Sequence, residues 1–197
     1  MHSYSTDSIE RIRIPFFLAA LGILLAWGLS RFTNIFGISI PWWFDAPAAM
    51  GFYGLLYNYF NNSMWKWSWM RKLRIIQTPD LNGVWTGHFL TSHDGHTEEK
   101  PATVEIKQTW SKICIVFKNS TSRSKSISAS LLTDSGEGLV LSYEYQNEPG
   151  YNAVETMQIH KGFTRLIMTA PQQLKGEYYT GRGRLSYGTM SFSRSNG

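Results

Sequence analysis

The pattern of apolar and polar residues divides the chain into two parts. The first part contains an uncharged apolar run from Ile14 to Leu29 and a second apolar stretch from Ile38 to Phe60. After Pro79 the pattern changes to short segments in which apolar and polar residues alternate, with turn sequences between them. Long apolar runs are typical of membrane helices, whereas alternation is typical of β-strands whose two faces differ.

The two apolar stretches predict a hairpin of transmembrane helices, with spans at about residues 14–31 and 46–64. A span needs about 17–25 residues, and side chains that flank the first run extend its length. A cleaved signal peptide also has a basic start and an apolar run, but we find no convincing cleavage site of small residues. We therefore predict that residues 1–75 form a retained membrane anchor with two spans.

Positive charges flank the predicted spans on one side. Arg11 and Arg13 precede the first span, and four cations follow the second, whereas the connecting loop has Arg31 offset by Asp45. Lysine and arginine accumulate on the cytoplasmic side of membranes. Both termini are therefore predicted to be cytoplasmic, together with everything after Arg74.

Residues 76–197 are predicted to form a cytoplasmic domain made of strands. We count about eight alternating segments, separated by turns such as TDSGEG and NEPG. Short turns between neighbours favour an up-and-down arrangement, and about eight strands can close around a small interior or one ligand. The expected fold is thus a two-helix hairpin followed by an antiparallel, up-and-down β-barrel of about eight strands.

Composition limits the functions that such a domain can have. The net charge of +5 is too small and too dispersed to indicate wrapping of DNA or RNA. The sequence has no nucleophile motif, phosphate loop or cysteine pair. His93 and His96 have the spacing of metal ligands, but they lie in a glycine-containing turn without a partner cluster. We therefore expect no enzymatic activity, no catalytic residue, no metal and no cofactor.

Ligand recognition is better supported than catalysis. The β-domain combines tryptophans and tyrosines, which stack on bases, with arginines, which pair with phosphates. In YYTGRGRLSYG (residues 178–188), alternation puts Tyr178 and Thr180 on one face of a strand and Tyr179 on the other. Arg182, between two glycines, is the expected phosphate contact in this stretch, and Arg184 is expected to be solvated.

The order of the motifs resembles that of a known family. Two predicted spans precede PDLNGVWTG, Q-x-W-x-K-I (108–113), S-x-S-x-S-A (124–129), Y-x-Y-x-N-x-P (143–149), H-x-G (160–162) and GEYYTGRGR (176–184). This set is similar to the two-transmembrane, β-strand-rich effectors of bacterial cyclic-oligonucleotide-based antiphage signalling (CBASS). The similarity extends from about residue 11 to residue 194.

The resemblance implies a function in antiviral defence. Members of this family bind a cyclic dinucleotide, made by a partner nucleotidyltransferase, in a cytoplasmic β-barrel. Binding drives homo-oligomerisation in the bacterial inner membrane, and the assembly disrupts this lipid bilayer and kills the infected cell (abortive infection). The implied ligand-binding residues are those at the motif positions: Trp110, Tyr143, Tyr145, Asn147, Tyr178, Thr180 and Arg182.

Two other functions fit the same pattern of residues. A membrane-tethered, lipocalin-like barrel would bind an apolar small molecule in a dry cavity and would point its arginines to solvent. A barrel hydrolase acting on a nucleotide would need a paired acid and base or a metal set, which the sequence does not provide.

Overall fold

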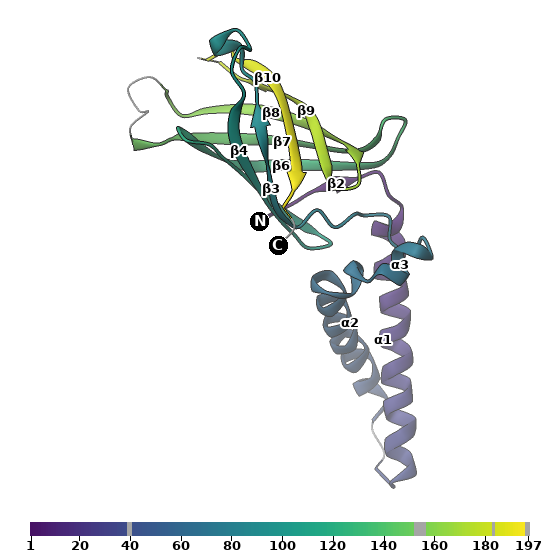
Figure 1. Cartoon of the computed structure of the whole chain (residues 1–197). Helices are drawn as coiled ribbons and strands as arrows, with labels where there is room; N and C mark the ends of the chain where they lie inside the picture. Colours follow the sequence, from purple (N-terminus) through teal and green to yellow (C-terminus); the bar gives the residue numbers. More distant parts are fainter. Residues whose placement is uncertain (39–40, 152–156, 183, 196–197) are drawn as a thin grey trace. The chain divides into compact units, whose positions relative to one another are not determined.

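The computed structural model describes residues 1–38, 41–151, 157–182 and 184–195 (Figure 1). The chain divides into two compact units. One unit is Ser8–Pro79, and the other joins Met1–Asp7 to Asp80–Gly197. The first seven residues, which sequence analysis assigned to the membrane anchor, are thus part of the β-unit.

The unit Ser8–Pro79 is helical. Its elements are α1 (Glu10–Ile35), η1 (Trp42–Phe44), α2 (Asp45–Asn62), η2 (Met64–Lys66) and α3 (Ser68–Lys72). Among the described residues, α1 is the one helix long and apolar enough to cross a membrane. The predicted second span falls on α2, whose aspartate and three asparagines (Asp45, Asn58, Asn61, Asn62) lower its hydropathy, so this span stays a prediction.

Helices α1 and α2 pack through a row of residues spaced by one helical turn. The buried side of α1 carries Ile14, Leu18, Gly22 and Ala26. Gly22 lies against the backbone of α2, since a Cβ atom added there would lie 3.0 Å from the carbonyl oxygen of Ala49. A small residue at this position lets the two helices approach closely.

The two ends of the helical unit are tied together by polar contacts. The buried carboxylate of Glu10 accepts hydrogen bonds from the backbone N–H groups of Gln77 (2.5 Å) and Thr78 (3.3 Å). The Ser8 hydroxyl donates to the side-chain oxygen of Gln77 at 2.9 Å. The segment that enters α1 is therefore held beside the segment that leaves this unit.

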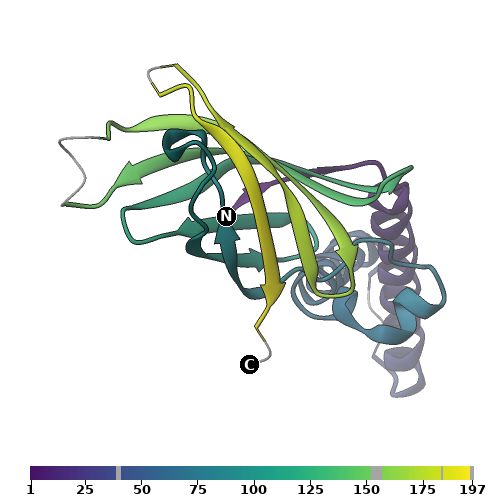
Figure 2. The same cartoon turned by 45° about the horizontal axis from the view of Figure 1, so that its top comes forward.

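The β-unit contains a closed barrel of eight strands (Figures 1 and 2). These are β3 (Gly83–Phe89), β4 (Lys100–Gln108), β5 (Lys112–Lys118), β6 (Ser122–Ser135), β7 (Gly138–Pro149), β8 (His160–Ala170), β9 (Gln173–Thr180) and β10 (Tyr187–Arg194). Each strand pairs antiparallel with its neighbours in sequence, and β10 pairs with β3 to close the barrel. The predicted fold, a helical membrane region followed by an antiparallel up-and-down barrel, is confirmed.

The N-terminal residues complete the barrel wall where β5 and β6 separate. These two strands pair directly with each other only beside their connecting turn, through Val116–Lys118. Farther from the turn, β1 (His2–Ser3) pairs with β5, and β2 (Ser5–Thr6) pairs with β6. Sequence analysis missed both strands because two residues are too short to show alternation.

Tyr4 lies between these two short strands and closes one end of the barrel core. Its side chain is buried, and its hydroxyl donates to the carbonyl oxygen of Trp110 at 2.8 Å. The Gln108 amide donates to the same hydroxyl (3.3 Å), and its oxygen accepts from the backbone N–H of Leu81 (2.9 Å). Gln108, an inward-facing polar residue, is therefore satisfied as part of this closed end.

We predict that the barrel depends on Tyr4 for stability. Because Tyr4→Ala removes a buried ring and a buried hydroxyl, it should lower the free energy of unfolding by about 3 kcal/mol. Tyr4→Phe, which removes only the hydroxyl, should cost about 1 kcal/mol. Denaturant unfolding of the full chain in detergent measures both values. Tyr151→Ala is the matched control, since Tyr151 is 96% exposed, and an equal loss in this control would contradict the assignment.

Candidate functional site

The opposite end of the barrel holds a cavity of about 370 Å³. This is the end at which the chain passes from β3 to β4, from β5 to β6, from β7 to β8 and from β9 to β10. Each of the eight barrel strands contributes at least one lining side chain. The cavity ends below Tyr143 and Thr164, because the next inward pair, Leu141 and Leu166, is fully buried in the core.

Three tyrosines, Tyr143, Tyr145 and Tyr178, line the cavity. Burial raises the pKa of Tyr143 to about 12. Burial also raises the pKa of Tyr145 and of Tyr178, although the charge of Arg184 opposes both shifts. All three phenols are therefore protonated at neutral pH. They offer hydrogen-bond donors without adding a negative charge that would repel an anionic ligand.

The structure brings together five of the seven residues that the sequence indicated. The lining residues among them are Tyr143, Tyr145, Asn147, Tyr178 and Thr180. Trp110 lies instead at the closed end, where it is 2% exposed and its carbonyl oxygen binds Tyr4. Arg182 is exposed and does not line the cavity.

Arg184 lines the cavity in place of Arg182, which reverses the order expected from the sequence. The reason lies in the turn after β9. Strand alternation stops at Thr180, whose backbone N–H and hydroxyl both bind the carbonyl oxygen of Ser186, at 2.8 and 3.0 Å. Strand alternation would place Arg182 and Arg184 on the same side, so it could not show which of them lines the cavity.

Polar residues that sequence analysis did not select also line the cavity. Ser124, on β6, donates a hydrogen bond to the side-chain oxygen of Asn147 at 2.8 Å. Thr164, on β8, is fully buried, and Lys100 begins β4. Alternation with the apolar Leu166 placed Thr164 on the inner face, and this signal was available in the sequence. No pattern in the sequence identified Lys100.

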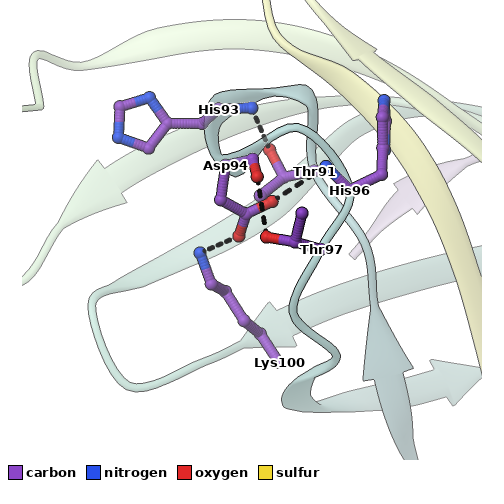
Figure 3. A network of polar contacts seen from close by, with 6 residues as sticks. All are labelled: Thr91, His93, Asp94, His96, Thr97 and Lys100. Atoms are coloured by element: carbon purple, nitrogen blue, oxygen red, sulfur yellow. Dashed lines mark hydrogen bonds and ion pairs between the residues drawn. The ribbon is translucent and has the colours of Figure 1, made fainter.

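A network of polar contacts orders the connection from β3 to β4 beside the cavity (Figure 3). The Asp94 carboxylate lies 2.5 Å from the Lys100 ammonium group, whose hydrogen bond holds the pKa of Asp94 below its usual value. His93 and His96 point in opposite directions from this turn (Figure 3). In the parts of the chain that the structure describes, no group of three or more His, Cys, Asp or Glu residues could hold a metal ion.

Comparison with known proteins gives the family. Residues 76–194 match the family model described as the Cap15 cyclic dinucleotide receptor domain, and residues 12–66 match the model described as the Cap15 TM helices. The chain belongs to the Cap15 family. The predicted resemblance to CBASS effectors is thereby confirmed.

Two relatives of this Cap15 chain are named CD-NTase-associated protein 15. The protein from Yersinia aleksiciae is 36% identical over 154 residues, which cover 77% of this chain and 71% of the relative. The protein from Staphylococcus schleiferi is 31% identical over 118 residues, which cover 60% of this chain and 62% of the relative. The cavity described above lies within the part that matches the Cap15 receptor domain.

We predict that Gly162 shapes this Cap15 cavity through Tyr145, its partner on β7. A Cβ atom added at Gly162 would collide with the Tyr145 hydroxyl and would lie 2.6 Å from the carbonyl oxygen of Tyr179. Gly162→Ala should therefore displace the Tyr145 ring and lower the free energy of unfolding by about 1–3 kcal/mol.

The control for this prediction is Gly136→Ala, because an added Cβ atom at Gly136 has no neighbour within 4 Å. Its effect should stay within about 0.5 kcal/mol in the same denaturant experiment. If Gly162→Ala were as harmless as the control, the close contact with Tyr145 would not constrain the cavity.

Proposed function

We propose that the chain is an antiphage effector that binds a cyclic dinucleotide in the barrel cavity, assembles with further copies in the bacterial inner membrane and disrupts that membrane. The disruption would kill the infected cell. The observation that supports this proposal best is a cavity of aromatic rings and neutral phenols, with Arg184 in its wall, inside a Cap15 receptor domain. The matching synthase would be a nucleotidyltransferase encoded by the same defence system.

The cavity suits the two chemical parts of such a ligand. Aromatic side chains stack on bases, and a guanidinium forms paired hydrogen bonds with phosphate oxygens. Among the described residues, the Arg184 guanidinium has no carboxylate partner, whereas the Lys100 ammonium group is paired with Asp94. Arg184 is therefore the cation that a phosphate can approach without displacing a carboxylate.

The helical unit suits membrane insertion. Helix α1 has 26 residues, and at about 1.5 Å per residue it exceeds the hydrocarbon thickness of a bilayer. We propose that α2 is the second span and that both termini are cytoplasmic. Trp67 and Trp69 are exposed beside Arg71 and Lys72, and this combination is typical of the membrane–water interface. Residues 8–79 would then form the anchor and the rest of the chain the receptor.

The proposed role requires no reaction on the ligand. Binding promotes assembly only if the ligand binds the assembled state more tightly than the free subunit. Anchoring in a membrane raises the effective concentration of the subunits, so a modest difference in affinity is sufficient. The hydroxyl and amide groups that line the cavity beside the aromatic rings suit a polar ligand better than an apolar one.

We predict that the full chain in nanodiscs binds a member of a panel of cyclic dinucleotides containing purines, pyrimidines or both. At about 100 times its dissociation constant, the bound member should stabilise the protein by about 2.7 kcal/mol, which thermal unfolding detects as a higher Tm. Mass spectrometry should recover the ligand unchanged. Stabilisation by fatty acids, with no response to any nucleotide, would support the alternative.

The same ligand should release dye from vesicles that contain the full chain. Arg184→Gln should shift this release to higher ligand concentration without preventing it at saturation, because the anchor is unchanged. Binding without any dye release would contradict membrane disruption and leave the receptor function intact.

We predict that Arg184 and Arg182 differ in their contribution to binding. Arg184→Gln should weaken the affinity for the ligand about tenfold or more, because it removes a charged hydrogen bond to phosphate. Arg182→Gln, the matched control, should have little effect, because Arg182 is exposed outside the cavity. Isothermal titration of both variants measures the difference, and a larger loss at Arg182 would restore the ranking expected from the sequence.

A further inference from the structure

Thr164 carries a polar group for which the protein provides no partner. Its side chain lies on β8, is fully buried and lines the floor of the cavity. Its hydroxyl oxygen makes no hydrogen bond in the described structure. Buried hydroxyls are almost always hydrogen-bonded, because losing water without gaining a partner is unfavourable. The unpartnered hydroxyl of Thr164 is therefore a candidate for contact with a ligand.

The surroundings of Thr164 are polar but uncharged. Its partners on the two neighbouring strands are Tyr143 on β7 and Tyr178 on β9. Thr164 lies close enough to Tyr143 to oppose the rise in the pKa of Tyr143. The distance and angle between the two hydroxyls are nevertheless outside the range of a hydrogen bond. The Thr164 hydroxyl is thus close to that of Tyr143 and is unsatisfied, whereas the hydroxyl of Tyr178 interacts with Thr91.

Charge is located closer to the opening than this floor. The Lys100 side chain is 33% exposed and Arg184 is half-buried, whereas Thr164 is inaccessible and Tyr143 is 2% exposed. An anionic phosphate at the floor would lose its hydration without an adjacent cation, which is strongly unfavourable. The floor is therefore suited to an uncharged group that both donates and accepts hydrogen bonds.

A nucleobase edge has these properties. It is flat and uncharged, and its carbonyl and N–H groups pair with hydroxyls, each of which can donate and accept. Phe89 and Phe117 also line the cavity and offer apolar ring surface next to the hydroxyls. We infer that Thr164, between Tyr143 and Tyr178, binds the edge of one nucleobase, so that the ligand enters base-first with its phosphates toward Arg184. This inference rests on the proposed function.

The test compares Thr164→Val with Thr164→Ser in the full chain in nanodiscs. Valine keeps the size of the side chain and removes the hydroxyl. Because the hydroxyl makes no bond within the protein, the Tm of the ligand-free protein should stay the same or rise. Affinity for the tightest-binding cyclic dinucleotide of the panel should fall about tenfold, and serine should restore most of it.

Two further measurements distinguish a base contact from a phosphate contact. The loss caused by Thr164→Val should differ between cyclic dinucleotides that differ in one base only. The dependence of affinity on salt concentration should match that of the wild type, whereas Arg184→Gln should reduce it, because salt screens charge interactions.

If the wild-type protein binds no cyclic dinucleotide, the proposed function fails and the inference fails with it. If the wild type binds and Thr164→Val binds equally well, the inference alone is overturned. A lower Tm of ligand-free Thr164→Val would show that the hydroxyl has a structural partner, and an altered salt dependence would place a phosphate at the floor. Either result would also overturn the inference.

Discussion

Closure of the sheet is the constraint on which the rest of the structure depends. Exposed strand edges present unpaired backbone groups that pair readily with other chains, and a closed barrel removes such edges. Here β10 meets β3, but β5 and β6 meet only beside their turn. The N-terminal strands β1 and β2 occupy the remaining part of this junction. The receptor wall is therefore complete only when the residues that precede the membrane helix are in place.

The two ends of the barrel have different chemistry because polar groups are satisfied at one end and available at the other. At the closed end, Tyr4, Gln108 and the carbonyl oxygen of Trp110 bind one another within the protein. At the open end, the phenols of Tyr143 and Tyr178 and the hydroxyl of Thr164 face a cavity. Burial alone does not mark a polar side chain as a ligand-binding group. The Gln108 side chain is buried with partners inside the protein, whereas the Thr164 hydroxyl is buried without one.

Local patterns predicted the barrel well because alternation and short turns act over neighbouring residues. The resemblance to the family, not alternation, indicated Tyr143, Tyr145, Tyr178 and Thr180, which lie within strands and keep their alternation. Local patterns did not predict β1 and β2, whose pairing with β5 and β6 joins residues more than a hundred positions apart. They also did not predict the placement of Arg184, because alternation puts Arg182 and Arg184 on the same side and the turn after Thr180 interrupts it.

The chain passes between its two units at Asp7–Ser8 and at Pro79–Asp80. On the β side, the Asp7 carboxylate accepts hydrogen bonds from the backbone N–H groups of Thr133 and Asp134, at 2.9 Å each. Strands β5 and β6 supply Phe117 and Ser124 to the cavity, and they also hold the N-terminal strands. A ligand that changes the spacing of β5 and β6 would therefore act on the residues that lead directly into α1. This covalent route requires no additional domain between receptor and anchor, since only residues 7–9 separate β2 from α1.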